Sequence, residues 1–525
     1  MPKTNRFYKD LFSEAWSLIL TPTESWQDDK ALQLCDSMSR QRKTPDFQRS
    51  LNAYCRSKPP RAIGLINDLP AAYDALFLQR IGISRDNVAK LFQLHRNPST
   101  RLRTLYQEEI LQHARISMIC PFSGGMITSR DSFIADNRVF YRFEGYEVFF
   151  VGTLRIKTGW EAAFCYLPQH DLVLLPVPRG TFEKNSKGPN IGRMIRRALL
   201  PRRSIAEICA RLKLVILNAF EDSCRYLQSR GNRTPTVLIG NSHFAHYALN
   251  EMSGYLRLKD KGLAQNARYH LLFEEPLGPV NELLDAPSHT LIRNKAKGKI
   301  SAVAMKNDLL VTRVGDIFIN EELRNRVARL AHSHCEKQFI ETMNWLHAKA
   351  FPLCWFSLKA DGRTCVNQTQ ALARIIISLR KKYPNLGLVF DSVSYPHCNQ
   401  GPVNRMDVWG NNRNVRRMKT TVEDIIKRAG AKDIPVHDLT GSSLFHAVVA
   451  ANRIDAFFCH CGTLQHKVGF FSLAPGIIHS NRKLLRSRWI ETWSKGFVTD
   501  RDVRYLDWRG VRDIGLLPFN TSARM

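Results

Sequence analysis

A nine-residue stretch near the carboxyl end of the chain, Cys459–Lys467, carries a high density of side chains that bind anions or exchange protons. It reads CHCGTLQHK, and a Pro-Gly-Ile-Ile-His segment that ends at His479 follows it. An apolar run precedes the stretch and a helical pattern follows, so we expect a strand, a tight turn and a helix. A helix that begins at such a turn presents free N–H groups and the positive end of its dipole. The stretch therefore predicts a site for a phosphate-bearing ligand.

The polar residues of this region have chemistry that suits a departing nucleoside diphosphate. Backbone N–H groups, an ammonium and imidazoles can stabilise the negative charge that develops on it, without a metal ion. The candidate donor-binding residues here are His460, Gly462, Thr463, Gln465, His466, Lys467 and His479. The alternative is an ordinary strand-to-helix turn with surface histidines. A metal site that includes Cys459 and Cys461 is less well supported, because such closely spaced strand residues are poorly placed for tetrahedral ligation.

A second polar group follows another short apolar run. Residues 240–246 read GNSHFAH and lead into a helical pattern. Histidine titrates near neutral pH, so His243 and His246 are candidate general bases, with Glu251 as an alternative or as an orienting partner. Glu274 belongs to a Glu-Glu pair that ends a further strand and is another candidate base. The alternative is a helix N-terminus with a buried histidine.

Two further candidates lie at the ends of other expected strands. Arg363 follows an apolar run over 353–358, and its planar guanidinium could pair with a phosphate or a sugar carboxylate. Asp391 ends the apolar run over 386–390 and could hold a ribose or sugar hydroxyl. A purely structural role suits either residue as well.

These candidates require a scaffold that gathers strand ends. From about residue 204, apolar runs of strand length alternate with amphipathic helical stretches, which predicts parallel sheets with helices on both faces. Ligands of such open sheets bind at the carboxyl ends of the strands. We expect an α/β fold with two Rossmann-like domains: a helical N-terminal region over 1–115, an N-terminal α/β acceptor domain over 116–340 with a small β-rich segment, and a C-terminal donor domain over 341–525.

Composition narrows the classes of protein and of partner. The 525-residue chain has 77 Lys and Arg against 47 Asp and Glu, a net charge of +30. This balance indicates nucleic acid, an anionic membrane surface or phosphorylated substrates, or else simply a basic solvated surface. The 12 cysteines include no CxxC pair, and neither a secretory signal nor an apolar run of spanning length occurs. We therefore expect reduced cysteines and a cytoplasmic location.

The two histidine motifs resemble those of GT-B glycosyltransferases that act on bacterial capsule and lipopolysaccharide polysaccharides. That group has an early Asn-Phe-Gly-His motif and a late His-Gly-Ala-Gly-Leu motif; this chain has HFAH over 243–246 and HCGTL over 460–464. The departures are His for Asn in the first motif and Cys-Gly-Thr for Gly-Ala-Gly in the second. The resemblance covers roughly residues 235–485. It implies that His246 lies at the acceptor and that His460 and its turn lie at the donor nucleotide.

The resemblance implies a metal-independent transferase that moves a sugar from a nucleotide-activated donor to a glycan or lipid-linked glycan in surface polysaccharide synthesis. One of the candidate bases would deprotonate the acceptor hydroxyl, while Arg363, His466 and Lys467 would stabilise the leaving diphosphate. We expect no cofactor, no metal and peripheral contact with the inner membrane. The alternatives are a basic nucleic-acid-binding protein, although no such module is recognisable, and a non-catalytic α/β scaffold, against which the polar strand ends argue.

Overall fold

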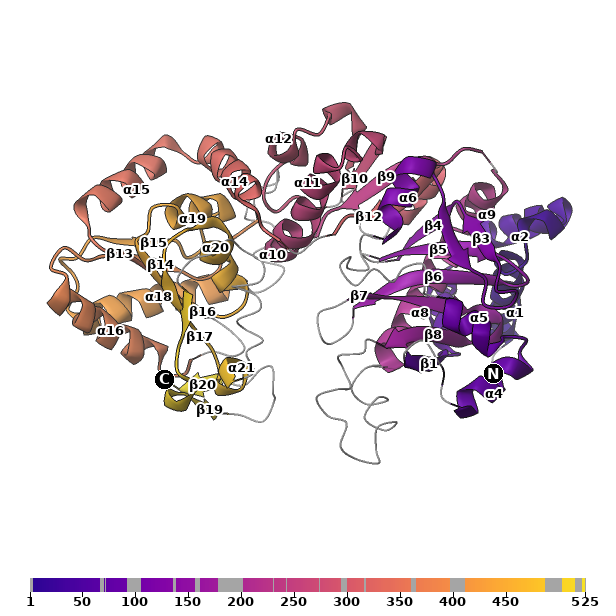
Figure 1. Ribbon diagram of the computed structural model, residues 1–525, viewed down its shortest axis with the longest axis horizontal. Coiled ribbons are helices and arrows are strands. Elements are labelled where there is room, and N and C mark those ends of the chain that lie inside the picture. Colours follow the sequence, from indigo (N-terminus) through magenta and orange to yellow (C-terminus); the bar gives the residue numbers. More distant parts are fainter. Residues whose placement is uncertain are drawn as a thin grey trace. The chain divides into compact units, whose positions relative to one another are not determined.

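The computed structural model divides the chain into two compact units. Unit 1 comprises residues 1–239, 258–273 and 290–314, and unit 2 comprises residues 240–257, 274–289 and 315–525 (Figure 1). The structure describes residues 3–66, 70, 72–91, 105–135, 138–155, 161–177, 202–229, 231–241, 243–272, 274–293, 300–315, 318–359, 365–396, 411–486, 503–514 and 522–524. No helix among these residues is long and apolar enough to cross a membrane.

Unit 1 begins with helices whose apolar faces share one core. They are α1 (Lys3–Ile19), α2 (Asp28–Gln41) and α3 (Pro45–Arg56), and they pack with α8 (Arg202–Asn218) and α9 (Phe220–Gln228). The remaining helices before residue 115 are α4 (Ala72–Arg80), α5 (Arg85–Lys90) and α6 (Leu105–His113).

A strand interrupts this N-terminal region, which the sequence predicted to be helical. Residues 61–66 form β1 (Arg61–Ile66), which pairs in parallel with β8 (Leu172–Val177). Ile63 and Leu65 are buried two residues apart, which is the period of a strand. The apolar run in this segment is only a few residues long, which is too short for a helical face.

The β-rich segment forms a mixed six-stranded sheet in the order β1-β8-β7-β6-β5-β4. All its neighbours except β1 and β8 pair antiparallel. Its other strands are β4 (Asp131–Ala135), β5 (Arg138–Glu144), β6 (Val148–Arg155) and β7 (Glu161–Leu167), and the hairpin of β2 (Ile116–Ile119) and β3 (Met126–Ser129) precedes them.

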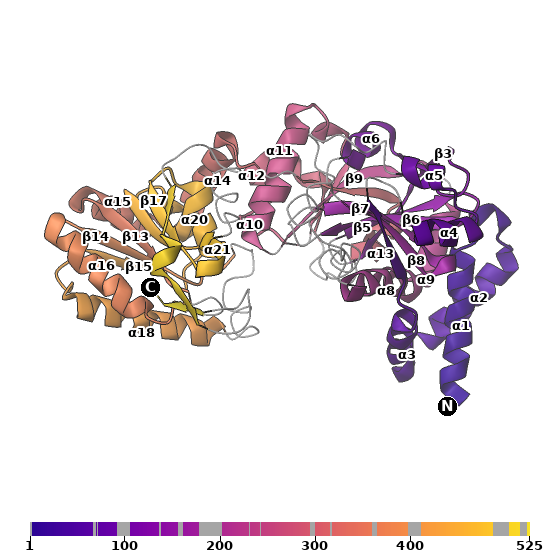
Figure 2. The same ribbon diagram turned by 60° about the horizontal axis from the view of Figure 1, so that its bottom comes forward.

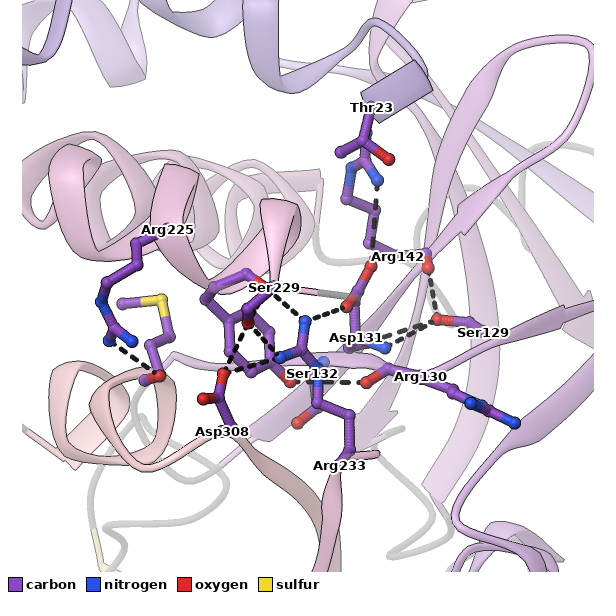
Figure 3. Close-up of polar contacts among 12 residues, drawn as sticks. Thr23, Ser129, Arg130, Asp131, Ser132, Arg142, Arg225, Ser229, Arg233 and Asp308 are labelled. Carbon is purple, nitrogen blue, oxygen red and sulfur yellow. Dashed lines mark hydrogen bonds and ion pairs between the residues drawn. The ribbon is translucent and has the colours of Figure 1, made fainter. Parts of the chain in front are cut away.

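A buried arginine connects this sheet to the parallel sheet of unit 1 (Figure 3). Arg233 lies just before β9 (Thr234–Ile239) and donates hydrogen bonds to Asp131 Oδ1 at 3.0 Å and to Asp308 Oδ1 at 2.7 Å. Its guanidinium also lies 3.8 Å from the centroid of the Tyr226 ring. Two carboxylates and an aromatic face therefore compensate the desolvation of this charge.

Replacing Arg233 with Met should destabilise unit 1 by about 2–3 kcal/mol, because Asp131 and Asp308 lose a shared partner. This loss of stability is smaller than the loss expected for a fully buried ion pair, because the Asp308 side chain is 41% exposed. Denaturant unfolding measures the change. Arg225→Met is the matched control, since the exposed Arg225 donates to the Met305 carbonyl and to no carboxylate among the described residues. Equal losses in the two variants would contradict this account.

The first parallel sheet has four strands in the order β11-β10-β9-β12. Its members besides β9 are β10 (Tyr269–Leu272), β11 (Leu291–Arg293) and β12 (Leu309–Arg313), and every pair is parallel. Numbered along the chain, the order is 3-2-1-4, which is the beginning of a doubly wound sheet. Helix α13 (Ile300–Lys306) packs against β12.

The parallel sheet of unit 2 has six strands in the order β15-β14-β13-β16-β17-β18. They are β13 (Leu353–Ser357), β14 (Gly387–Asp391), β15 (Val436–Asp438), β16 (Ala456–His460), β17 (Gly476–His479) and β18 (Val503–Tyr505). Numbered along the chain, the order is 3-2-1-4-5-6, the Rossmann topology. The fold is thus α/β with two Rossmann-like parallel sheets, as the sequence predicted.

Helices cover both faces of this second sheet. Apolar residues of α16 (Gln368–Lys382) and α18 (Asn411–Ala429) share a core with Cys354, Phe356 and Phe390 of the strands. The alternate strand residues Leu353 and Trp355 point to the opposite face of the sheet. There they share a second core with apolar residues of α15 (Lys337–Lys349) and α19 (Leu444–Ala451). The outer helix α14 (Glu321–His334) packs on α19 and on α20 (Thr463–Phe471).

The other elements of unit 2 are short. They are α10 (Phe244–His246), the π-helix η6 (Tyr247–Met252), α11 (Ser253–Asp260), which extends into unit 1, α12 (Val280–Leu284), α21 (Arg482–Arg486) and the hairpin of β19 (Arg512–Ile514) and β20 (Ser522–Arg524). Unit 2 therefore includes α14 and two segments after β9 and β10, so its limits differ from the single boundary that we expected near residue 340. The helix α14 packs on α19 and α20, and α15 packs on β14 and α19, which explains this difference.

Candidate functional site

The carboxyl edge of the second sheet gathers polar residues at its topological switch point. Strands β13 and β16 are neighbours there, and the chain leaves them toward opposite faces of the sheet. Ser357 ends β13 and His460 ends β16; both are buried, and the His460 N–H donates to Ser357 Oγ at 2.6 Å. Ligands of doubly wound sheets bind at this position.

The turn after His460 leads directly into α20. Gly462 has φ 115° and ψ −144°, a conformation that L side chains rarely adopt. No side chain caps the helix, and the first backbone bond across the turn runs from the His466 N–H to the Gly462 carbonyl at 3.3 Å. The N–H groups of Thr463, Leu464 and Gln465 precede that bond in the first turn of the helix. This arrangement can bind an anionic oxygen.

Two buried imidazoles lie beside this turn. His460 and His479 are paired across β16 and β17, and their ring centroids are 5.2 Å apart at 86°. The Nδ1–H of His460 donates to the Cys461 carbonyl at 2.7 Å, which fixes the orientation of this ring. His479 stacks on Phe458 at 4.6 Å, and burial, with a contribution from His460, holds its pKa well below the usual value. His479 is therefore neutral at physiological pH.

The helix α20 presents further polar side chains. Gln465 is buried, and its Oε1 accepts no hydrogen bond from the described residues. His466 stacks on Phe470 at 4.6 Å. Desolvation, followed by the proximity of His243 and His246, lowers the pKa of His466 to about 3. His466 is therefore neutral at physiological pH, in contrast to the cationic role that we expected at a diphosphate.

These depressed pKa values predict that unit 2 loses stability in mild acid. The unfolded chain protonates a histidine near pH 6.5, whereas folded His466 and His479 stay neutral far below that pH. Below about pH 6.5 the unfolded state thus binds more protons, and the free energy of unfolding falls by up to about 1.4 kcal/mol per pH unit for each histidine.

Denaturant unfolding at a series of pH values between 7 and 5 measures this slope. We expect the free energy of unfolding to depend less steeply on pH in His479→Gln. The decrease in slope should correspond to about one proton, because glutamine does not titrate. An identical slope in the wild type and in His479→Gln would contradict the neutral state assigned to His479.

Lys467 has partners that the sequence did not indicate. Its buried ammonium donates to Asp391 Oδ1 at 2.7 Å and Oδ2 at 2.8 Å, to the Ser392 carbonyl at 2.9 Å and to Ser394 Oγ at 2.8 Å. An ammonium has three N–H donors, so these four oxygens use all of them. Lys467 and Asp391 therefore form a buried ion pair in place of the phosphate and sugar-hydroxyl contacts that we expected.

The two histidines that follow β9 lie at the start of α20. His243 is exposed, and its Nε2 lies 3.0 Å from Thr463 Oγ1 within a hydrogen bond. The rings of His243 and His246 are 5.0 Å apart, and His246 Nδ1 lies 3.1 Å from Asn250 Oδ1. Residues more than 200 positions apart in the sequence thus meet within unit 2.

Glu251 supports the backbone that carries these histidines. It is buried, and its Oε2 accepts hydrogen bonds from the N–H groups of Gly240 and Asn241, both at 2.8 Å. The π-helix places Glu251 toward the turn that follows β9. Glu251 thus holds the turn that precedes the histidines, and its part in the reaction stays a prediction.

The geometry of this site does not test two other predicted residues. Glu274 is half-buried after β10, and its neighbour Glu275 accepts a hydrogen bond from the Val280 N–H at 2.8 Å. Arg363 lies outside the described residues. The role of each stays a prediction.

Sequence reasoning missed two residues of the site, namely Ser357 and Ser394. A polar residue that ends an apolar strand, as Ser357 does, is a signal that could have been used. The place of Ser394 depends on loop conformation and carries no such signal.

The described residues contain no group of three or more His, Cys, Asp and Glu side chains that could hold a metal ion. Cys459 and Cys461 are buried and form no disulfide bond with another described residue. Residues with the chemistry of a metal ligand, such as His460 and His479, instead contact one another and the backbone.

Comparison with known proteins finds remote likenesses to solved structures. No protein-family model and no curated protein sequence matches the chain. A solved structure described as "Trehalose-6-phosphate from E. coli bound with UDP-2-fluoro glucose" is similar at a TM-score of 0.24 and 10% sequence identity, over 60% of this chain and 74% of that chain. A likeness this remote carries no argument about the site, so the interpretation rests on the geometry described above.

Proposed function

We propose that the protein is a metal-independent glycosyltransferase that uses a nucleotide-activated sugar. The observation that carries the proposal is the glycine-initiated helix α20 at the switch point of a sheet with the order 3-2-1-4-5-6. A helix N-terminus with free N–H groups suits the phosphates of a nucleotide. Further support comes from His243, which precedes α10 and contacts Thr463 at the same helix end.

On the donor side, backbone groups would stabilise the leaving diphosphate. The N–H groups of Thr463, Leu464 and Gln465 are fixed by the helix and require no reorganisation as charge develops. Lys467 takes an indirect role in this proposal, since its ion pair with Asp391 anchors α20 to β14. His460 and the neutral His479 would offer hydrogen bonds to polar groups of the donor.

On the acceptor side, His246 would act as the general base. A neutral imidazole that donates through Nδ1 to Asn250 carries its lone pair on Nε2, the state in which it can accept a proton from a hydroxyl. His243 would hold Thr463 and with it the end of α20. We extend the proposal to a glycan or lipid-linked glycan as acceptor, in surface polysaccharide synthesis at the inner membrane face.

The test is release of nucleoside diphosphate from nucleotide sugars (UDP, GDP and ADP forms, with CMP release from CMP sugars) in the presence of EDTA, with and without glycan acceptors. We expect one donor to be consumed, and an acceptor to accelerate its consumption. Consumption that requires a divalent metal, or no consumption of any donor with any acceptor, would overturn the proposal.

A further inference from the structure

The outer face of α18 carries a cluster of basic side chains that form no ion pair within the described part of the chain. Arg413, Arg416, Arg417 and Lys419 lie in its first half and are all exposed. None forms an ion pair with another described residue, and the first turn contains no acidic side chain. With the exposed Arg374 and Lys381 on the adjacent helix α16, these residues form what we name the basic helix face.

Helix stability does not explain this arrangement. The apolar residues Val415, Met418, Val422 and Ile425 already fix the buried face of α18. Positive charges near a helix N-terminus oppose the helix dipole. Arg413 and Arg417 are also four residues apart, a spacing at which like charges repel. A choice of residues that costs local stability indicates a function outside the fold.

The first half of α18, which carries the four basic residues, lies at the carboxyl edge of the second sheet. Val415 packs against Gly441, where a Cβ atom would lie 2.9 Å from Val415 Cγ1. The Gly441 N–H donates to the Val393 carbonyl at 2.8 Å, and Val393 follows the end of β14. The basic helix face thus extends to the edge that holds the switch point.

We propose that the basic helix face binds the anionic surface of a phospholipid membrane. The helices α16 and α18 lie side by side (Figure 2), and surface potentials of anionic lipids attract clustered Lys and Arg. Neither α16 nor α18 contains an aromatic residue, which disfavours single-stranded nucleic acid because bases stack on aromatic rings. The inference stands apart from the proposed transfer reaction, since it uses only surface charge.

Sedimentation with lipid vesicles tests this inference on the full chain. The vesicles contain phosphatidylcholine with 0, 20 or 40% phosphatidylglycerol, at several NaCl concentrations. We expect binding that rises with the anionic lipid and falls with salt. The variant combines Arg413→Gln, Arg416→Gln, Arg417→Gln and Lys419→Gln. Each charge should contribute about fivefold to the affinity for anionic vesicles, so the variant should bind them at least about a hundredfold more weakly.

The matched control removes four exposed charges from unit 1, at Arg42, Lys43, Arg56 and Lys58, again as Gln. We expect it to retain vesicle binding within about a few fold, because a polybasic cluster acts locally. Circular dichroism and thermal unfolding should show that the α18 variant is folded and at least as stable as the wild type, since like-charge repulsion is relieved.

Equal losses in the two variants, or no loss in the α18 variant, would overturn the proposal. Competition by soluble glycerophosphoglycerol at millimolar concentration would show a pocket for free phosphate in place of a membrane surface. Oligonucleotide binding that is tighter than vesicle binding at the same salt concentration, and is lost in the α18 variant, would reassign the face to nucleic acid. None of these outcomes depends on whether a nucleotide sugar binds.

Discussion

Replacing Lys467 with Met should destabilise unit 2 by about 3–5 kcal/mol, because the fully buried Asp391 carboxylate then has no cation beside it. Methionine has nearly the length of lysine, so the loss reports mainly the charge and its hydrogen bonds. Denaturant unfolding followed by the fluorescence of the buried Trp355 in β13 measures the change. Because α20 depends on this pair, we also expect weaker nucleotide binding as a secondary effect.

A double-mutant cycle separates the ion pair from the packing of the two side chains. Asp391→Leu alone should also be strongly destabilising, since it leaves the Lys467 ammonium buried against Ser392 and Ser394. The combination with Lys467→Met should be less damaging than the sum of the two changes, with a coupling of about 2–3 kcal/mol. Additive effects, or a Lys467→Met variant within about 1 kcal/mol of the wild type, would show that the pair has little importance.

Replacing His246 with Ala should lower kcat by about 10²–10⁴-fold while the nucleotide affinity stays within about threefold. The reason is that His246 would take the proton of the acceptor, whereas the donor phosphates would contact backbone groups of α20. Initial rates over a range of acceptor concentrations, together with calorimetric titration of the nucleotide, give the two quantities.

Two further variants sharpen this test. Asn250→Ala should lower kcat by a smaller factor and shift the pH profile, because it removes the oxygen that orients His246 Nδ1. His347→Ala, on the exposed surface of α15, should leave both quantities unchanged. If the His246→Ala enzyme retained full kcat, another residue would have to be the general base, and Glu274 is the next candidate.

The sequence allowed the architecture of unit 2 to be predicted because each local signal agreed with the fold. Apolar runs of strand length alternated with amphipathic helices, and Asp391 and His460 marked strand ends that the structure confirms. The positive φ of Gly462 was also foreseeable, since a strand that turns at once into a helix requires an unusual backbone conformation.

The charge states of the site could not be predicted in this way. Lys467 and Asp391 are 76 positions apart, and only the packing of α20 against β14 brings them together. His466 and His479 are neutral because of burial, which the residue type does not reveal. The strand at Arg61–Ile66 escaped notice because its partner, β8, lies more than 100 residues later in the chain.

The central claim is that unit 2 binds a nucleotide at α20 without a metal ion. The most direct test is the thermal unfolding of the purified chain with nucleoside diphosphates and nucleotide sugars, in EDTA, beside the Gly462→Val variant. A ligand that binds the native state raises the melting temperature. We expect one nucleotide to raise it in the wild type, and the strained turn of the variant to abolish the shift. No shift with any nucleotide, or an equal shift in both proteins, would contradict the account.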